Sequence, residues 1–231
     1  MKLYSVQPLA VYDLLCREGL FHSRPQDYPD STLNLFNDDF RFAVAYQWLI
    51  ERMIERGLAR PHPEVFPVWA YLYWINRAKP KPDLRYTALK RWGKSGRQVL
   101  LTMIIPDDRV LLSDYDQWFS CLCYGPAGSV RDMEAFWRRS EKLGPRPYDQ
   151  PYPEPFHQEL LDTWRLVLDL AAARKKNRIS KANQCIQATF WELTADQVIE
   201  AVAFGDGRPR ERLPLPGRRK GPRRGYPRLD G

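Results

Sequence analysis

The sequence has no long apolar run and few of the residues that hold metals or disulfides. No segment reaches 18 consecutive apolar residues, and residues 1–10 lack the apolar core of a secretory signal. The four cysteines are too few and too irregularly spaced for a disulfide framework, and a C-x-C pair with no histidine nearby is a poor zinc signature. We therefore expect a cytoplasmic protein with reduced cysteines, no bound metal and no membrane segment.

The acidic and histidine residues do not stand at metal-ligand spacing. Asp107 and Asp108 occupy a turn-like Pro-Asp-Asp sequence, and Asp114 or Asp116 precedes a helical stretch that an aspartate would cap. The histidines are isolated from one another along the chain: His22, His62 and His157. We interpret the aspartates as structural and the histidines as solvated loop residues.

Positive charge is concentrated at the C-terminal end. Residues 206–231 carry nine Lys or Arg and three Asp or Glu, a balance of +6 out of the total of +8, which leaves +2 for residues 1–205. This tail is rich in Pro, Gly and Arg and poor in apolar residues, so we expect it to be disordered. It is either a salt-sensitive anchor for RNA, DNA or an acidic surface, or a solubilising extension.

Hydrophobic periodicity predicts helices and strands in mixed order within one domain, residues 1–205. Strands are expected at 2–7, 65–75, 97–106, 109–113, 185–193 and, as a short edge strand after a capped turn, 198–204. Helices are expected at 9–18, 38–58, from Asp114 or Asp116 to 123, 130–143 and 156–176. Because no regular β-α-β rhythm is present, we predict an α+β fold with a mixed, mainly antiparallel sheet and packed helices.

Two further patterns have a plain structural interpretation. Residues 88–95 resemble a phosphate-binding loop that would use Lys94 and Ser95, but a strand follows instead of the required helix, so we predict no nucleotide binding there. The many aromatic residues are more typical of a core than of a base-stacking surface, because residues 69–74 have no interleaved Lys or Arg. Nucleic-acid binding by the domain itself remains an alternative.

The strand at 185–193 raises a question about its one charged residue. Successive side chains of a strand alternate between faces, so Glu192 would lie on the side of Ile186, Ala188 and Phe190. A carboxylate on that core-facing side is either a functional group in a partly dry site or a strand-end residue in solvent or paired with an arginine.

Five segments, in order, resemble a family of small bacterial proteins known only as a domain of unknown function. The segments begin with residues 2–7 and end with residues 186–193, and they include the aromatic strand at 66–74. The resemblance covers residues 1–204 and implies that the tail lies outside the shared domain. It implies no activity.

The chain opens with a strand that ends in a polar residue, then a helix and Gly19-Leu20, and a late strand places Glu192 before residues 193–202. This layout resembles that of the ADP-ribosyltransferases, including their DNA-modifying toxins. In that fold a split antiparallel sheet holds NAD, and a late-strand Glu stabilises the ribosyl oxocarbenium ion. The resemblance puts Glu192 at that catalytic position and Ser5 at the first-strand position that holds the NAD ribose and amide, where the family usually has His or Arg. Tyr46, Trp69 and Tyr71 are the candidates for stacking on nicotinamide.

The resemblance therefore implies an NAD-dependent enzyme of the toxin or defence type. Its acceptor would be a nucleic acid or a protein, and a neutralising partner protein would be expected. The alternative is a non-catalytic binding or regulatory module whose tail attracts nucleic acid. The two hypotheses predict different effects of Glu192→Gln. If Glu192 is catalytic, NAD consumption should fall while the fold survives; if it is structural, the stability of the fold should fall.

Overall fold

The computed structural model describes residues 1–24, 40–85, 96–145, 147 and 150–217 and contains one large antiparallel sheet. The seven strands of this sheet follow the order β5-β6-β3-β1-β4-β8-β9, and all neighbours are antiparallel. Their bounds are β1 Lys2–Pro8, β3 Val68–Tyr73, β4 Gln98–Ile104, β5 Leu111–Asp114, β6 Ile186–Phe190, β8 Val198–Phe204 and β9 Glu211–Leu213. The predicted α+β class with a mainly antiparallel sheet is confirmed.

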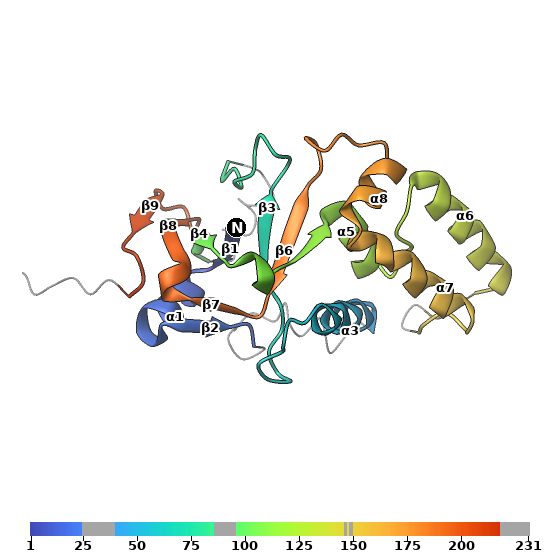
Figure 1. The fold of residues 1–231 in the computed structure, drawn as a ribbon, viewed down its shortest axis with the longest axis horizontal. Helices are drawn as coiled ribbons and strands as arrows, with labels where there is room; N and C mark the ends of the chain where they lie inside the picture. The colour runs from blue at the N-terminus through green and yellow to red at the C-terminus, as the bar shows by residue number, and fades with distance from the viewer. Residues whose placement is uncertain (25–39, 86–95, 146, 148–149, 218–231) are drawn as a thin grey trace, which may run out of the picture.

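Six α-helices and a second, two-stranded sheet complete the described part of the chain (Figure 1). The helices are α1 Leu9–Glu18, α3 Phe40–Glu55, α5 Tyr115–Leu122, α6 Val130–Ser140, α7 Phe156–Thr163 and α8 Leu170–Lys176. The small sheet pairs β2 Leu20–His22 with β7 Glu192–Thr194. Helices α5 to α8 extend from the β5 edge of the large sheet, on the right of Figure 1.

The opening strand, helix and glycine form as their sequence predicts. Helix α1 begins after Pro8, which cannot donate a backbone hydrogen bond, and ends at Gly19, whose φ of 75° suits a residue without a Cβ. The Gly19 amide donates to the carbonyl of Leu15 at 3.0 Å, which satisfies one of the last free carbonyls of the helix. This cap turns the chain directly into β2.

Two apolar clusters cover the two faces of the sheet. On one face, α1 packs Val11 and Leu15 against residues such as Leu101 of β4. On the other, α3 and α5 bury Trp48 and Trp118. Alternate residues of β5 divide between the clusters, since Leu111 belongs to the helical one and Leu112 packs against the α1 one. The sheet is therefore an internal layer over much of its area.

The prediction of one continuous helix over residues 156–176 is wrong, because the structure has two short helices there. The chain forms α7, a 3-10 turn at Trp164–Val167 and then α8. Trp164 is fully buried and its indole Nε1 donates to the carbonyl of Gly125 at 2.8 Å. The side chain of Asp169 then caps α8 through the amide of Ala172. Packing around the tryptophan and this cap replace a straight helix with two short ones.

The tail is ordered further than its composition predicts. Residues 211–213 form β9, which pairs with β8, so β8 is not the edge strand that we expected. Arg97 of the domain forms an ion pair with Glu211 at 2.8 Å, and Leu213 packs against the α1 cluster. Backbone pairing with an exposed strand edge compensates for the low apolar content. The boundary predicted at 205/206 therefore cuts through the sheet.

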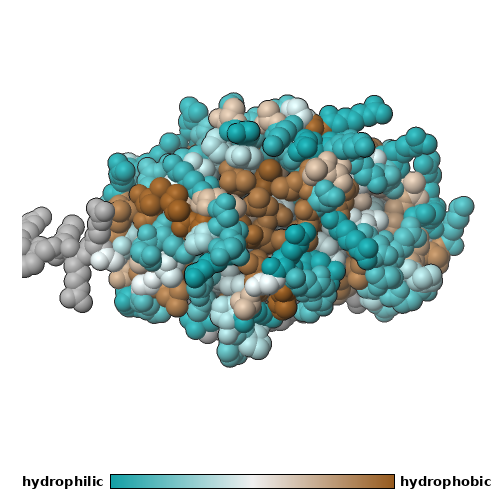
Figure 2. Space-filling view, viewed as in Figure 1, coloured by the Kyte–Doolittle hydropathy of each residue, from teal (hydrophilic) through white to brown (hydrophobic). Residues whose placement is uncertain are grey.

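Some sequence predictions lie outside the described residues. They are the helix cap at Asp38 or Asp39, the phosphate-loop lookalike up to Ser95, and the tail from residue 218. In the part of the chain that the structure describes, no helix combines the length and the apolar character needed to cross a bilayer. A hydrophobic area lies at the centre of the face seen in Figure 2.

Candidate active site

The chain leaves the large sheet and enters the small one at Trp191, and this change determines the direction of the Glu192 side chain. Strand β6 ends at Phe190, and β7 begins at Glu192 as a partner of β2. Leu193 is fully buried in the same apolar cluster as Phe190, whereas Trp191 belongs to the opposite cluster. The alternation predicted through residues 185–193 is therefore wrong at this bend. Glu192 does not enter the core with Phe190, and its side chain is 36% exposed.

Glu192 lies between an imidazole and a guanidinium. Its Oε2 is 3.3 Å from Nε2 of His22, which is its direct cross-strand partner in the β2–β7 ladder. Its Oε1 is 3.7 Å from an Nη of Arg109, in the 3-10 turn that joins β4 to β5. Each carboxylate oxygen thus faces a side chain from a distant segment, His22 at hydrogen-bond distance and Arg109 at ion-pair distance.

A cavity of about 320 Å³ opens beside this carboxylate. It is walled by three segments, the loop after α3 (residues 57–61), the loop after β4 (residues 105–109) and the β6–β7 bend (residues 190–192). The indole Nε1 of Trp191 donates to the carbonyl of Leu58 at 2.9 Å and fixes one wall against another. The cavity has apolar sides and a charged rim, which is the usual character of a small-ligand site.

Ser5 is placed away from this cavity. It is 1% exposed in β1, and its hydroxyl donates to the carbonyl of Trp69 at 2.6 Å. The same hydroxyl accepts from Nε2 of Gln7 at 2.8 Å. Ser5 is not one of the described lining residues of the Glu192 cavity. Its hydrogen bonds fasten β1 to β3, so the structure does not bring Ser5 and Glu192 together.

The three predicted aromatics gather on the face of β3 that α3 and α5 cover. Tyr46 lies edge-on to Trp69, with ring centroids 6.1 Å apart, and Trp118 stacks on Trp69 at 5.1 Å. Tyr71 contacts Trp74 edge-on at 4.6 Å. Burial, together with nearby Tyr115 and Cys185, raises the pKa of Tyr71 above its ordinary value. None of the three predicted aromatics is among the described residues that line the Glu192 cavity.

Sequence reasoning missed His22 and Arg109. His22 was assigned to a solvated loop, yet it belongs to β2 and faces Glu192 across the ladder. The sequence holds no direct signal for this contact, because residues 20–22 and 192–194 are each too short to be recognised as paired strands. Arg109 follows the Pro-Asp-Asp turn that was recognised, but a turn does not reveal what its last side chain reaches.

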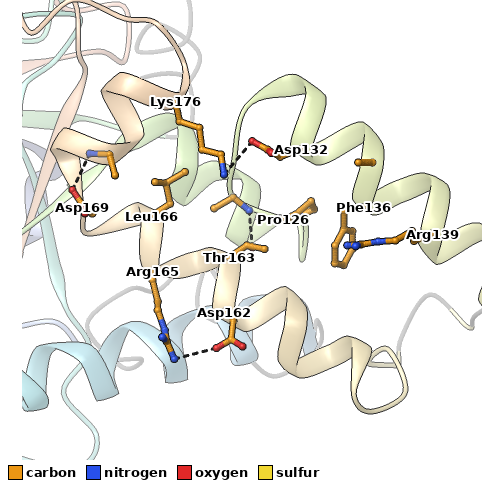
Figure 3. A pocket seen from close by; sticks show the side chains of 13 residues that line it. Pro126, Asp132, Phe136, Arg139, Asp162, Thr163, Arg165, Leu166, Asp169 and Lys176 are labelled. Atoms are coloured by element: carbon orange, nitrogen blue, oxygen red, sulfur yellow. Dashed lines mark hydrogen bonds and ion pairs between the residues drawn. The ribbon is translucent and has the colours of Figure 1, made fainter.

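A larger cavity, of about 490 Å³, lies among α6, α7 and α8 (Figure 3). Each charged side chain that lines it has a partner, including Arg139 with Glu159 and Asp169 with the amide of Ala172. Lys176 pairs with Asp132 at 3.2 Å, and Arg165 with Asp162 at 3.1 Å. It shares no lining residue with the Glu192 cavity. Charge pairing does not distinguish the two cavities, because Glu192 is paired as well. Glu192 remains the candidate catalytic group because it is the residue that the sequence resemblance puts at the catalytic position.

Comparison with known proteins gives a family but no activity. The model of one family, described as a domain of unknown function (DUF3841), matches residues 2–199. No curated protein and no solved structure matches the chain. The matched range ends within β8, before β9.

Proposed function

The chain belongs to the DUF3841 family, and from the geometry around Glu192 we propose that it cleaves the nicotinamide–ribose bond of NAD and transfers ADP-ribose. One observation carries this proposal: the Glu192 carboxylate borders an apolar-walled cavity, and its two oxygens face His22 and Arg109. Of the described residues that the resemblance to ADP-ribosyltransferases implies, Glu192 alone borders the cavity, and its place as the late-strand Glu supports the choice of reaction. The acceptor is a nucleic acid or a protein, in a toxin or defence role.

The reaction places positive charge where a carboxylate can stabilise it. The C1′–N1 bond breaks, its electron pair leaves with nicotinamide, and an oxocarbenium ion forms at C1′ of the ribose. An acceptor oxygen or nitrogen then attacks C1′ and loses its proton. Glu192, at the wall of the cavity, stabilises the cation electrostatically, and this interaction strengthens as bound substrate displaces water from the cavity. A cavity of about 320 Å³ suits the nicotinamide–ribose end of NAD and not the whole dinucleotide.

His22 and Arg109 orient the carboxylate in this scheme. The cross-strand position of His22 fixes Oε2, while Arg109, whose side chain is 59% exposed at the rim, is free to move toward a phosphate of the diphosphate. The alternative function, a binding or regulatory module, uses the same contacts differently: the two pairs would merely fasten the β6–β7 bend to β2 and to the loop after β4.

The test is nicotinamide release from NAD, with and without nucleic acid or cell lysate as acceptor. Glu192→Gln keeps the side-chain shape but removes the charge, so release should fall at least about 100-fold. Glu200→Gln is the matched control, since Glu200 is also partly exposed and paired with a cation, Lys81, outside the cavity. Its release should stay within about twofold of the native rate.

Thermal stability of the same variants separates the two functions. A catalytic Glu192 is not needed for folding, so Glu192→Gln should melt close to the native protein. A marked loss of stability, together with no nicotinamide release by the native chain under any acceptor condition, would contradict the proposal. It would leave Glu192 as part of the scaffold.

A further inference from the structure

Two loops at the opposite end of β6 from Glu192 form a surface of one charge. The loop after β3 contributes residues 77–81, and the end of α8 with the loop before β6 contributes residues 174–181. Together they hold eight cations and no carboxylate: Arg77, Lys79, Lys81, Arg174, Lys175, Lys176, Arg178 and Lys181. We call these two segments the basic ridge. They lie side by side at the upper edge of Figure 1, and that edge is hydrophilic in Figure 2.

Hydrogen bonds join the two loops and fix their shapes. The amide of Arg77 donates to the carbonyl of Ala182 at 3.0 Å. Within the first loop, Oδ1 of Asn76 accepts from the amide of Lys79 at 2.9 Å. Below the second, the buried side chain of Gln184 donates to Asp114 at 2.7 Å and to the carbonyl of Leu170 at 3.0 Å. The cations therefore project from a formed surface.

Most of these cations have no ion-pair partner within the described residues. Lys81 pairs with Glu200 at 2.5 Å and Lys176 with Asp132 at 3.2 Å. For the other six, no ion pair is found in the part of the chain that the structure describes, and five of the six are exposed to solvent. These six cations lie on two segments joined by a backbone hydrogen bond, where like charges repel one another and a bound polyanion would relieve that repulsion.

We propose that the basic ridge binds the phosphate backbone of a nucleic acid. Cations on two adjoining loops suit the repeated phosphates of a nucleic acid, and three of the eight are arginines, which can contact a phosphate through two N–H groups. Within residues 77–81 and 174–181 no large apolar side chain is exposed to insert into a bilayer, which favours nucleic acid over a lipid surface. This binding does not depend on the proposed reaction at Glu192.

The location of this charge differs from the sequence expectation. Summed over residues 1–205 the charge is only +2, which pointed to the tail as the attractive segment. The fold brings together cations that are distant in sequence, and ion pairs within the described residues balance two of the eight, Lys81 and Lys176. A near-neutral total therefore conceals a strongly basic edge.

The test measures affinity for a fluorescent oligonucleotide duplex across a range of salt concentrations, using the full chain. The ridge variant replaces three exposed lysines by glutamine: Lys79→Gln, Lys175→Gln and Lys181→Gln. The control variant replaces three exposed cations of the α6 region: Arg131→Gln, Arg138→Gln and Lys142→Gln. Both variants lose three charges, so they differ only in where the charge is removed. Circular dichroism and melting temperature confirm that each is folded.

The ridge variant should bind at least about tenfold more weakly than the native protein, and the slope of log affinity against log salt should fall by about two to three. The control variant should stay within about threefold. Equal losses in the two variants would overturn the proposal, because they would show a response to net charge alone. Absence of duplex binding, or binding to vesicles of anionic lipid instead of the duplex, would also overturn it.

Discussion

The two ends of β6 carry opposite electrostatic arrangements. At the end that leads into β7, the Glu192 carboxylate contacts His22 and Arg109 beside a largely apolar cavity that Asp108 also lines. At the end that follows α8, the basic ridge holds eight cations, of which Lys81 and Lys176 pair with carboxylates from other segments. A balanced charge at a cavity suits chemistry on a small substrate, whereas an unbalanced surface suits attraction of a large polyanion. One short buried strand thus separates a candidate reaction site from a candidate binding surface.

The cavity end should be the more sensitive to loss of a buried side chain. Trp191 is 6% exposed and ties the β6–β7 bend to Leu58, so Trp191→Ala should lower the free energy of unfolding by about 3–5 kcal/mol. Phe119→Ala is the control, because Phe119 is 56% exposed and should cost less than about 1 kcal/mol. Urea denaturation of the two variants measures this. Similar losses would show that Trp191 does not anchor the bend.

The ridge end depends on a buried carboxylate. Asp114 caps α5 through the amide of Gln117 and accepts the hydrogen bond from Gln184 that holds the second ridge loop. Asp114→Ala removes the cap and leaves the buried amide of Gln184 without one partner, so we expect a loss of about 2–3 kcal/mol. The exposed Asp13→Ala is the control in the same denaturation experiment. If Asp114→Ala lowers the free energy of unfolding by less than about 0.5 kcal/mol, the second ridge loop is held by other contacts.

Removal of the edge strand β9, which is far from β6 in the strand order, should leave both ends of β6 intact. A chain that stops after Phe204 lacks β9, including the Arg97–Glu211 ion pair. We expect it to lose about 1–2 kcal/mol, since the pairing with β8 and the packing of Leu213 disappear. Calorimetry against the full chain tests this. An unchanged melting temperature would show that β9 contributes nothing to stability.

The smallest expected effect is the pH dependence of stability that comes from Glu200, which pairs Lys81 of the ridge with β8 of the sheet. Hydrogen bonds from Lys81, and then from Thr102, lower the pKa of Glu200 below its ordinary value of 4.5. A depressed pKa stabilises the fold above pH 4.5, and this contribution is lost as the pH falls through and below that value. Because both partners are partly exposed, it should stay below about 1 kcal/mol.

Glu200→Gln removes this contribution, so the native protein should be the more stable of the two at neutral pH. The difference should shrink as the pH falls below 4.5. Melting curves of the two proteins from neutral to acidic pH check this. A difference that grows on acidification would contradict the assigned ion pair.

Local patterns were enough to predict most elements of the fold. The apolar repeat and the glycine predicted α1, and the aspartate before an apolar stretch predicted the start of α5 at Asp114. These features depend on residues within a few positions of one another. The break between α7 and α8 was missed, because the contact that accompanies it, from Trp164 to Gly125, spans 39 positions.

The candidate site was predictable only in part. Glu192 could be singled out because a charged residue interrupts an apolar alternation. Its direction could not, since the bend at Trp191 depends on which strand β7 joins. His22 and Arg109 reach Glu192 through the pairing of β2 with β7 and through the turn after β4. Such contacts depend on the assembled fold and leave no periodic trace in the sequence.

The most direct test of the whole account is nicotinamide release from NAD by three proteins assayed side by side: native, Glu192→Gln and the ridge variant. We predict release by the native protein, at least about 100-fold slower release by Glu192→Gln, and release within about twofold of native by the ridge variant when NAD is the only substrate added. Equal release by the native protein and Glu192→Gln, or none by the native protein with or without oligonucleotide, would contradict the account.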